Sequence, residues 1–216
     1  MTTFNWYEIT APSIPWLVHG LLANDSHSAF VGKPKSGKST LVRNLAVSIV
    51  KGRDLLGRKV NVPTTGGRVL YIHLDRKDPI HDVADELRKL GITAEESKRL
   101  MLMSSEDIPQ SLEARLLWLQ DRVKDFKPQL IIIDLLFQFI NVQESNSYVQ
   151  VLAAINGLQD TLRKVNFRGH TVTAHHQRKA VSTQDPFDDI LGSSSIRGSF
   201  ATLHSVSPRS RCPGRR

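Results

Sequence analysis

Residues 32–40 of this 216-residue chain read GKPKSGKST, a spacing that suits the binding of a chain of phosphates. Glycines at such positions let the backbone curl so that successive N–H groups point at phosphate oxygens, and the dipole of a following helix adds to that field. Lys38 would then place its ammonium against the β- and γ-phosphates, and the Ser39 hydroxyl would ligate Mg²⁺. The alternative is a surface turn rich in Gly, Ser and Lys. The pattern G-x-x-x-x-G-K-[ST] predicts contacts along the whole loop: Gly32, Lys33, Pro34, Lys35, Ser36, Gly37, Lys38, Ser39 and Thr40.

Asp134 is the second candidate. It ends the unbroken apolar run at 130–133, which is typical of a parallel strand buried on both faces. Downstream of a phosphate loop, such a strand delivers its carboxylate to the Mg²⁺ shell, so we expect Ser39 and Asp134 to hold the metal and Asp134 to take part in catalysis. Buried strands also often stop at an acid for structural reasons alone.

Asp75 is the third candidate, at the end of a predicted strand over residues 68–74. A carboxylate at the carboxyl end of a strand points into the crevice where α/β folds bind ligands, and there it would polarise the water that attacks a γ-phosphate. Alternatively, Asp75 pairs with Arg76 or Lys77 at the surface, or caps the next helix. Asp78 competes for that cap because it directly precedes Pro79.

Two histidines, His175 and His176, follow a predicted strand over 171–174. In that place His176 would hydrogen-bond the γ-phosphate and report its loss to the adjoining loop. The alternative is a pair of partly buried histidines that only pack. A metal site is less favoured, because no Cys or acidic cluster lies beside them at ligand spacing.

Strands and helices that alternate along the chain predict how these residues are positioned. The apolar spacing predicts an α/β fold with a mainly parallel sheet and helices on both faces. In order, we expect a helix after residue 40 that ends at Gly52, a linker over 57–67, a strand over 68–74, a helix over 80–90 closed by Gly91, a strand over 100–103, a helix over 112–123 capped by Ser111, a strand over 130–133, a helix over 152–162, a strand over 171–174 and a polar loop through 190.

The length suits one large α/β domain, which we place at 28–206. Residues 1–27 form an N-terminal segment, and its apolar patch at 16–18 is expected to pack against the edge of the main sheet. Residues 207–216, SPRSRCPGRR, have no apolar periodicity, so we expect a basic tail without fixed structure.

Composition excludes several classes of protein. Hydrophobic residues make up 40% and charged residues 23%, as in a soluble globular protein, and no apolar run approaches the ~20 residues that span a bilayer. The N-terminus lacks a signal-peptide pattern, and the single cysteine, Cys212, fits a cytoplasmic location. The formal net charge of +8 is compatible with a nucleic-acid partner without establishing one, since four arginines lie in the last eleven residues.

Taken in order, the motifs resemble those of RecA-like ATPases, most closely the RepA-type hexameric helicases of the AAA-family ATPases. The matching segments lie between residue 16 and about residue 206: WLVHGLL, GKPKSGKST, GRVLYIHLDRKDP, LIIIDLLFQF, TAHHQRK and DDILGSSSIRGS. The resemblance implies binding of ATP and Mg²⁺, and a ring-shaped homo-oligomer, such as a hexamer, with hydrolysis sites between subunits. It also assigns the water-activating carboxylate to the position of Asp75, where relatives usually carry the longer Glu.

By the same resemblance, residues 177–191 correspond to a loop that contacts DNA, with Arg178 and Lys179 as phosphate contacts. An arginine finger that acts across the subunit interface is also implied, and Arg197 is the candidate. Relatives continue with further strands beyond the Gly-Ser-Ser segment, whereas this chain turns into its basic tail. That departure indicates a truncation or a shifted reading frame, and it predicts a sheet that lacks edge strands.

The sequence therefore predicts an ATPase that couples hydrolysis to work on DNA, as a helicase or a replication-associated motor. One rival is a non-catalytic or slowly hydrolysing ATP-binding regulator or scaffold of a mobile-element or DNA-repair system, which Asp75 and the unusual C-terminus favour. A second rival is a small-molecule kinase, in which the segment after His176 would have no role.

Overall fold

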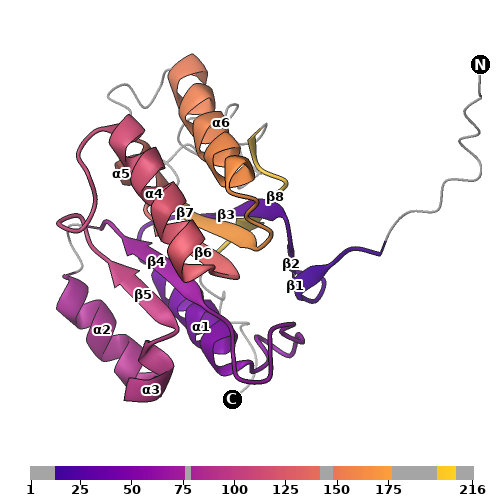
Figure 1. Ribbon diagram of the computed structural model, residues 1–216. Coiled ribbons are helices and arrows are strands. Elements are labelled where there is room, and N and C mark those ends of the chain that lie inside the picture. The colour runs from indigo at the N-terminus through magenta and orange to yellow at the C-terminus, as the bar shows by residue number, and fades with distance from the viewer. Residues whose placement is uncertain (1–12, 76–78, 142–147, 177–198, 208–216) are drawn as a thin grey trace, which may run out of the picture.

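The computed structural model describes residues 13–75, 79–141, 148–176 and 199–207. Its centre is a six-stranded sheet in the order β5-β4-β6-β7-β3-β8, and every pairing between neighbouring strands is parallel (Figure 1). The strands are β3 (Ser26–Gly32), β4 (Val69–His73), β5 (Leu100–Met103), β6 (Leu130–Asp134), β7 (His170–His176) and β8 (Thr202–Ser205). Because all six run the same way, their carboxyl ends lie at one edge of the sheet.

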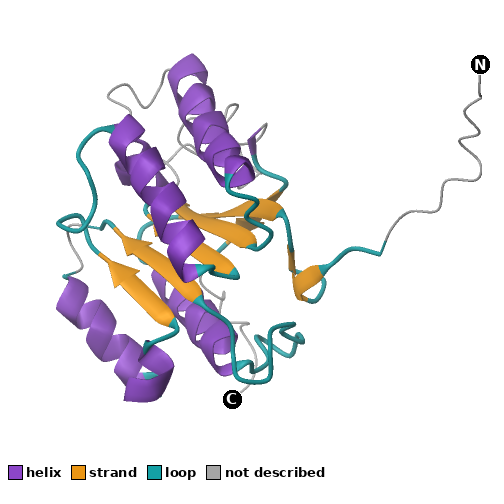
Figure 2. Cartoon of the chain, in the orientation of Figure 1, coloured by secondary structure: helices purple, strands orange, loops and turns teal. Residues whose placement is uncertain are grey.

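Helices cover both faces of the sheet, as the sequence predicts (Figure 2). On one face, α1 (Lys38–Lys51) and α2 (Ile80–Lys89) pack against side chains such as Phe30 and Ile132. On the other face lie α4 (Leu112–Phe126), α5 (Leu136–Ile140) and α6 (Tyr148–Lys164), packed against side chains such as Ile131. Successive residues of a strand point to opposite faces, so the apolar run of β6 supplies both cores.

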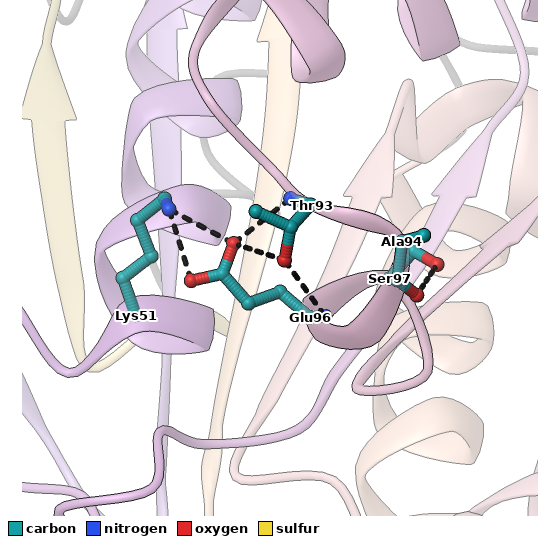
Figure 3. A network of polar contacts seen from close by, with 5 residues as sticks. All are labelled: Lys51, Thr93, Ala94, Glu96 and Ser97. Carbon is teal, nitrogen blue, oxygen red and sulfur yellow. Dashed lines mark hydrogen bonds and ion pairs between the residues drawn. The ribbon is translucent and has the colours of Figure 1, made fainter.

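Helix ends follow local sequence signals. Gly52 ends α1 in the left-handed conformation (φ 62°), and the Ser111 hydroxyl accepts from the Ala114 N–H at the start of α4, both as predicted. The one-turn helix α3 (Ala94–Ser97) was not predicted from the sequence. It begins with a reciprocal cap between Thr93 and Glu96, and the Glu96 carboxylate also accepts two hydrogen bonds from Lys51 at the end of α1 (Figure 3).

The N-terminal segment forms a small hairpin of β1 (Trp16–Val18) and β2 (Leu22–Ala23), separate from the main sheet. The sequence predicts that this apolar patch packs on the core, against the edge of the main sheet. Leu17 and Leu22 are buried in the core on the face that α1 covers, and Val18 forms a bridge with Val60 of the linker. Beyond β3, the sheet continues into β8, which is its edge strand on that side, and the expected lack of further strands stays a prediction.

In the part of the chain that the structure describes, no helix has both the length and the apolar character needed to cross a bilayer.

Candidate functional site

The predicted phosphate loop joins the end of β3 to the start of α1 and folds into a tight turn. Its backbone is left-handed at Lys35 (φ 62°) and at Gly37 (φ 95°), and the Ser36 N–H donates to the Lys33 carbonyl at 3.2 Å. Gly37 is the N-cap of α1, so the positive end of that helix and its unpaired amides lie at the loop. The loop contains both exposed and buried residues: Lys33, Pro34, Lys35, Gly37 and Thr40 are exposed, Ser39 is half-buried, and Gly32, Ser36 and Lys38 are buried.

Gly32 is needed because other atoms lie where a side chain would start. A Cβ at this position would stand 2.3 Å from the Val206 carbonyl oxygen and 2.7 Å from the Ser36 hydroxyl. Val206 is held there by its N–H, which donates to the Val31 carbonyl at 2.7 Å. The segment that follows β8 therefore closes directly against the first residue of the loop.

Lys38 lies inside the turn rather than in solvent. Its ammonium donates to the carbonyls of Gly32 at 2.8 Å and Lys33 at 2.9 Å, and the residue is only 4% exposed. Burial lowers the pKa of Lys38, while the negative charges of Asp134 and Asp75 act to raise it. The three groups are thus close enough to interact electrostatically.

Asp134, at the end of β6, is completely buried. Its Oδ2 accepts a hydrogen bond from the Tyr71 hydroxyl at 3.2 Å, and its Oδ1 has no hydrogen-bond partner among the described residues. Burial raises the pKa of Asp134; His73, Tyr71 and Arg43 oppose that shift, and the charge of Asp75 adds to it. A buried carboxylate oxygen of this kind fits a bound cation, which would stabilise the charged form.

Asp75 follows β4 after one intervening residue and is partly buried. Its charge reaches both Lys38 and Asp134, so the structure brings together three of the predicted site residues at the carboxyl edge of the sheet. The register of β4 and β6 explains why Asp75 and Asp134 lie close together, because His73 at the end of β4 lies opposite Asp134 in β6. Asp78, the competing acid, lies outside the described residues.

The two histidines end β7 and differ in position. His175 is buried, and its ring packs edge-on against Phe137 with 4.4 Å between centroids. This contact is compatible with the packing interpretation for His175, which stays a prediction. The backbone of His176 lies opposite Gly32 in the sheet register, next to the phosphate loop, and the sensor role of its side chain stays a prediction.

Other predicted features fall outside the described residues. They are Arg197 as the arginine finger, the DNA-contacting loop at 177–191, and residues 208–216 of the tail.

Sequence reasoning missed Tyr71 and Arg43, which both act on Asp134. A signal for Tyr71 is present in the chain: a phenol and an imidazole, at 71 and 73, occupy alternate positions in an otherwise apolar strand. Alternation places both on one face of β4. Arg43 lies in the apolar stretch of α1 and is 4% exposed, and burial of an arginine at such a position needs partners.

Mg²⁺ is the metal that this site would take. It prefers hard oxygen ligands, and the buried Oδ1 of Asp134 is such an atom, while the Ser39 hydroxyl on the first turn of α1 would be a second. Within the described ranges there is no cluster of three or more His, Cys, Asp or Glu that would bind a metal by protein ligands alone. Mg²⁺ that is bound together with phosphates usually takes only one or two protein ligands.

In a comparison with protein families, the family described as AAA domain (AAA_25) matches residues 1–182. A search of curated proteins found no match. The family model covers the phosphate loop, Asp75, Asp134 and the end of β7, the same residues that the fold gathers at one edge. The chain therefore belongs to the AAA domain family of P-loop ATPases.

Proposed function

We propose that this protein hydrolyses ATP and uses the energy for work on DNA, as a helicase or a replication-associated motor. The observation that carries the ATPase part is the position of Lys38. Its ammonium lies inside the loop at the start of α1, within electrostatic reach of two carboxylates at the carboxyl edge of a parallel sheet.

Each group at this edge has a role in the proposed reaction. The loop amides and Lys38 bind the phosphates, and Ser39 with Asp134 holds Mg²⁺, which supplies charge neutralisation on the phosphate oxygens. Asp75 orients and deprotonates the attacking water. His176, beside Gly32 in the sheet, senses the γ-phosphate, and Arg197 of a neighbouring subunit stabilises the charge that develops during transfer.

Work on DNA is the finer part of the proposal. It rests on the resemblance of the segment from TAHHQRK onward to RepA-type helicases, and the net charge of +8 is compatible with it. Residues 177–191, with Arg178 and Lys179, would contact the DNA phosphates inside a ring of identical subunits. Residues 177–191 begin directly after β7, so a change in the conformation of His176 would be transmitted to them along the chain.

Steady-state phosphate release, with and without single-stranded DNA, tests the proposal. Turnover that DNA stimulates is the expected result. Tight ATP binding with negligible turnover would contradict it and would favour an ATP-binding regulator, in which Asp75 reaches the water less well than Glu does.

The ring has a separate test. Size-exclusion chromatography with light scattering, in the presence of a non-hydrolysable ATP analogue, is expected to show an oligomer such as a hexamer. A monomer under these conditions would contradict hydrolysis sites between subunits.

A further inference from the structure

Three side chains connect helix α2 to the buried carboxylate of Asp134. Glu86 of α2 pairs with Arg43 of α1, the positive charge of Arg43 acts on both Tyr71 and Asp134, and the Tyr71 hydroxyl hydrogen-bonds Asp134. We call Glu86, Arg43 and Tyr71 the Tyr71 network. The phosphate-loop pattern and the strand-end acids predict none of these three residues.

The direction of each hydrogen bond follows from the chemistry of the groups. A guanidinium only donates, so Arg43 gives a hydrogen to the Glu86 carboxylate. The single hydrogen of the Tyr71 hydroxyl points at Oδ2 of Asp134, 3.2 Å away, because an ionised carboxylate oxygen only accepts.

Burial makes this arrangement strong. Tyr71 and Asp134 are fully buried, so water does not compete for the hydrogen bond between them. In such surroundings a hydrogen bond is electrostatically stronger than it would be in water. Burial also raises the pKa of Tyr71 well above its ordinary value, so the phenol keeps its proton at neutral pH.

The consequence concerns the two oxygens of Asp134. Tyr71 occupies Oδ2, whereas Oδ1 is buried and has no hydrogen-bond partner within the described part of the chain. With one oxygen fixed, the carboxylate cannot rotate without breaking that bond, so the same oxygen is always presented.

We propose that Tyr71 is a positioning residue, which holds the Asp134 carboxylate so that Oδ1 serves as a ligand for nucleotide-bound Mg²⁺, and that the ion pair of Arg43 with Glu86 supports this arrangement. This inference rests on the proposed function of the site. It also couples two carboxylates, because α2, which carries Glu86, begins five residues after Asp75. A shift of α2 would act on Asp75 through the chain and on Asp134 through the Tyr71 network.

The test uses the full-length protein and a fluorescent ATP analogue, with binding measured as Mg²⁺ is titrated. Tyr71→Phe keeps the ring and removes only the hydroxyl. We expect the Mg²⁺ concentration at half-saturation to rise about 10-fold, as is usual when a group that orients a metal ligand is lost. Binding of the analogue in excess EDTA should stay unchanged, because the loop amides and Lys38 are intact.

Two further variants test the rest of the network and control for the loss of a carboxylate. Glu86→Gln should raise the Mg²⁺ requirement in the same direction but by less, because it weakens only the far end of the network. Glu95→Gln is the matched control: Glu95 also pairs with a base, Lys98, but on the exposed α3, and its loss should leave the Mg²⁺ titration unchanged.

An unchanged Mg²⁺ titration in Tyr71→Phe would overturn the inference. So would an equal loss of binding with and without Mg²⁺, since that would indicate damage to the loop rather than to the metal ligand. Absence of nucleotide binding by the unaltered protein would be a different outcome, which would contradict the proposed function itself.

Discussion

Contacts between individual atoms stabilise the turn of the phosphate loop. The carbonyl of Val206 occupies the space beside Gly32, and the ammonium of Lys38 lies among the loop carbonyls. The pattern of glycines and lysine predicts the loop from sequence, because each residue has a local reason for its place. The contact with Val206 could not be predicted, since it depends on a strand that returns from far along the chain.

Gly32→Ala tests this contact. The added methyl group would meet the Val206 carbonyl at 2.3 Å, so we expect the free energy of unfolding to fall by about 1–3 kcal/mol and nucleotide binding to weaken. The control is Gly57→Ala, where φ is 74° but no atom lies within 4 Å of the added Cβ. Gly57→Ala should lower the free energy of unfolding by about 1 kcal/mol through backbone strain and leave nucleotide binding unchanged. Urea unfolding measures the stability of the two variants, and nucleotide titration measures their binding. Equal binding by Gly32→Ala and the unaltered protein would contradict the account.

Periodicity predicts most of the longer elements and misses the short ones. The helices α1, α2, α4 and α6 and the strands β4 to β7 follow apolar spacing that the sequence shows plainly. The one-turn helices α3 and α5 are too short for a period to be read, and β8 has exposed ends and only four residues. Such elements form because tertiary contacts complete them.

Arg115 is the contact that completes α5, the short helix after Asp134. From α4 it donates to the carbonyl of Pro109 at 2.6 Å and to those of Gln138 and Phe139 at 2.5 and 2.7 Å. The last two are carbonyls of the final turn of α5, which have no partner within the helix. Arg115→Met should therefore lower the free energy of unfolding by about 2–4 kcal/mol, because buried carbonyls lose charged donors.

The matched control for Arg115→Met is Arg163→Met, an exposed residue that pairs with Asp160 in α6. It should change stability by no more than about 0.5 kcal/mol in the same urea unfolding experiment. Similar losses in the two variants would show that the α5 carbonyls do not depend on Arg115.

Glu96 joins α3 to the end of α1 (Figure 3). Hydrogen bonds from Lys51, and next from the Thr93 N–H, lower the pKa of Glu96 to about 2. A carboxyl with a lowered pKa in the folded state stabilises the fold above its unfolded pKa near 4.5, and that contribution is lost as the pH falls toward 2. Glu96→Gln should cost about 1 kcal/mol at pH 7, the usual scale for a cap or an accessible ion pair.

The pH dependence supplies the check on Glu96. The difference in unfolding free energy between Glu96→Gln and the unaltered protein should be constant from pH 5 to 7 and should shrink below pH 4.5. A difference that persists undiminished at pH 3 would show that the charge of Glu96 is not its source.

Across the whole molecule, the parallel sheet has the candidate site at one edge, and the opposite edge contains contacts that stabilise the fold. At that opposite edge, His170 begins β7, and its imidazole bonds to the Ala23 carbonyl of β2 and to the Ser28 hydroxyl of β3, both at 2.6 Å. Because Nδ1 faces a carbonyl, it carries the hydrogen, and Nε2 accepts from Ser28. The histidine is thus neutral in the folded protein and ties three strands together.

Burial lowers the pKa of His170 to about 4. Between pH 4 and pH 6.5 the unfolded chain therefore binds a proton that the folded chain does not, so stability rises with pH across that window, by about 3 kcal/mol from this group. His170→Asn keeps a donor for Ala23 and cannot be protonated, so its stability should rise less steeply. Chemical unfolding at several pH values measures the two slopes, and equal slopes would contradict a neutral buried His170.

The central claim is that Lys38, at the mouth of the sheet, holds the phosphates of ATP for hydrolysis. The most direct measurement is steady-state phosphate release by the unaltered protein, by Lys38→Ala and by the control Lys89→Ala, which removes an exposed lysine at the end of α2. The account predicts that Lys38→Ala loses at least about 100-fold in turnover, the scale for loss of one preorganised charge or donor, whereas Lys89→Ala is unchanged. Phosphate release by Lys38→Ala at the rate of the unaltered protein would contradict it.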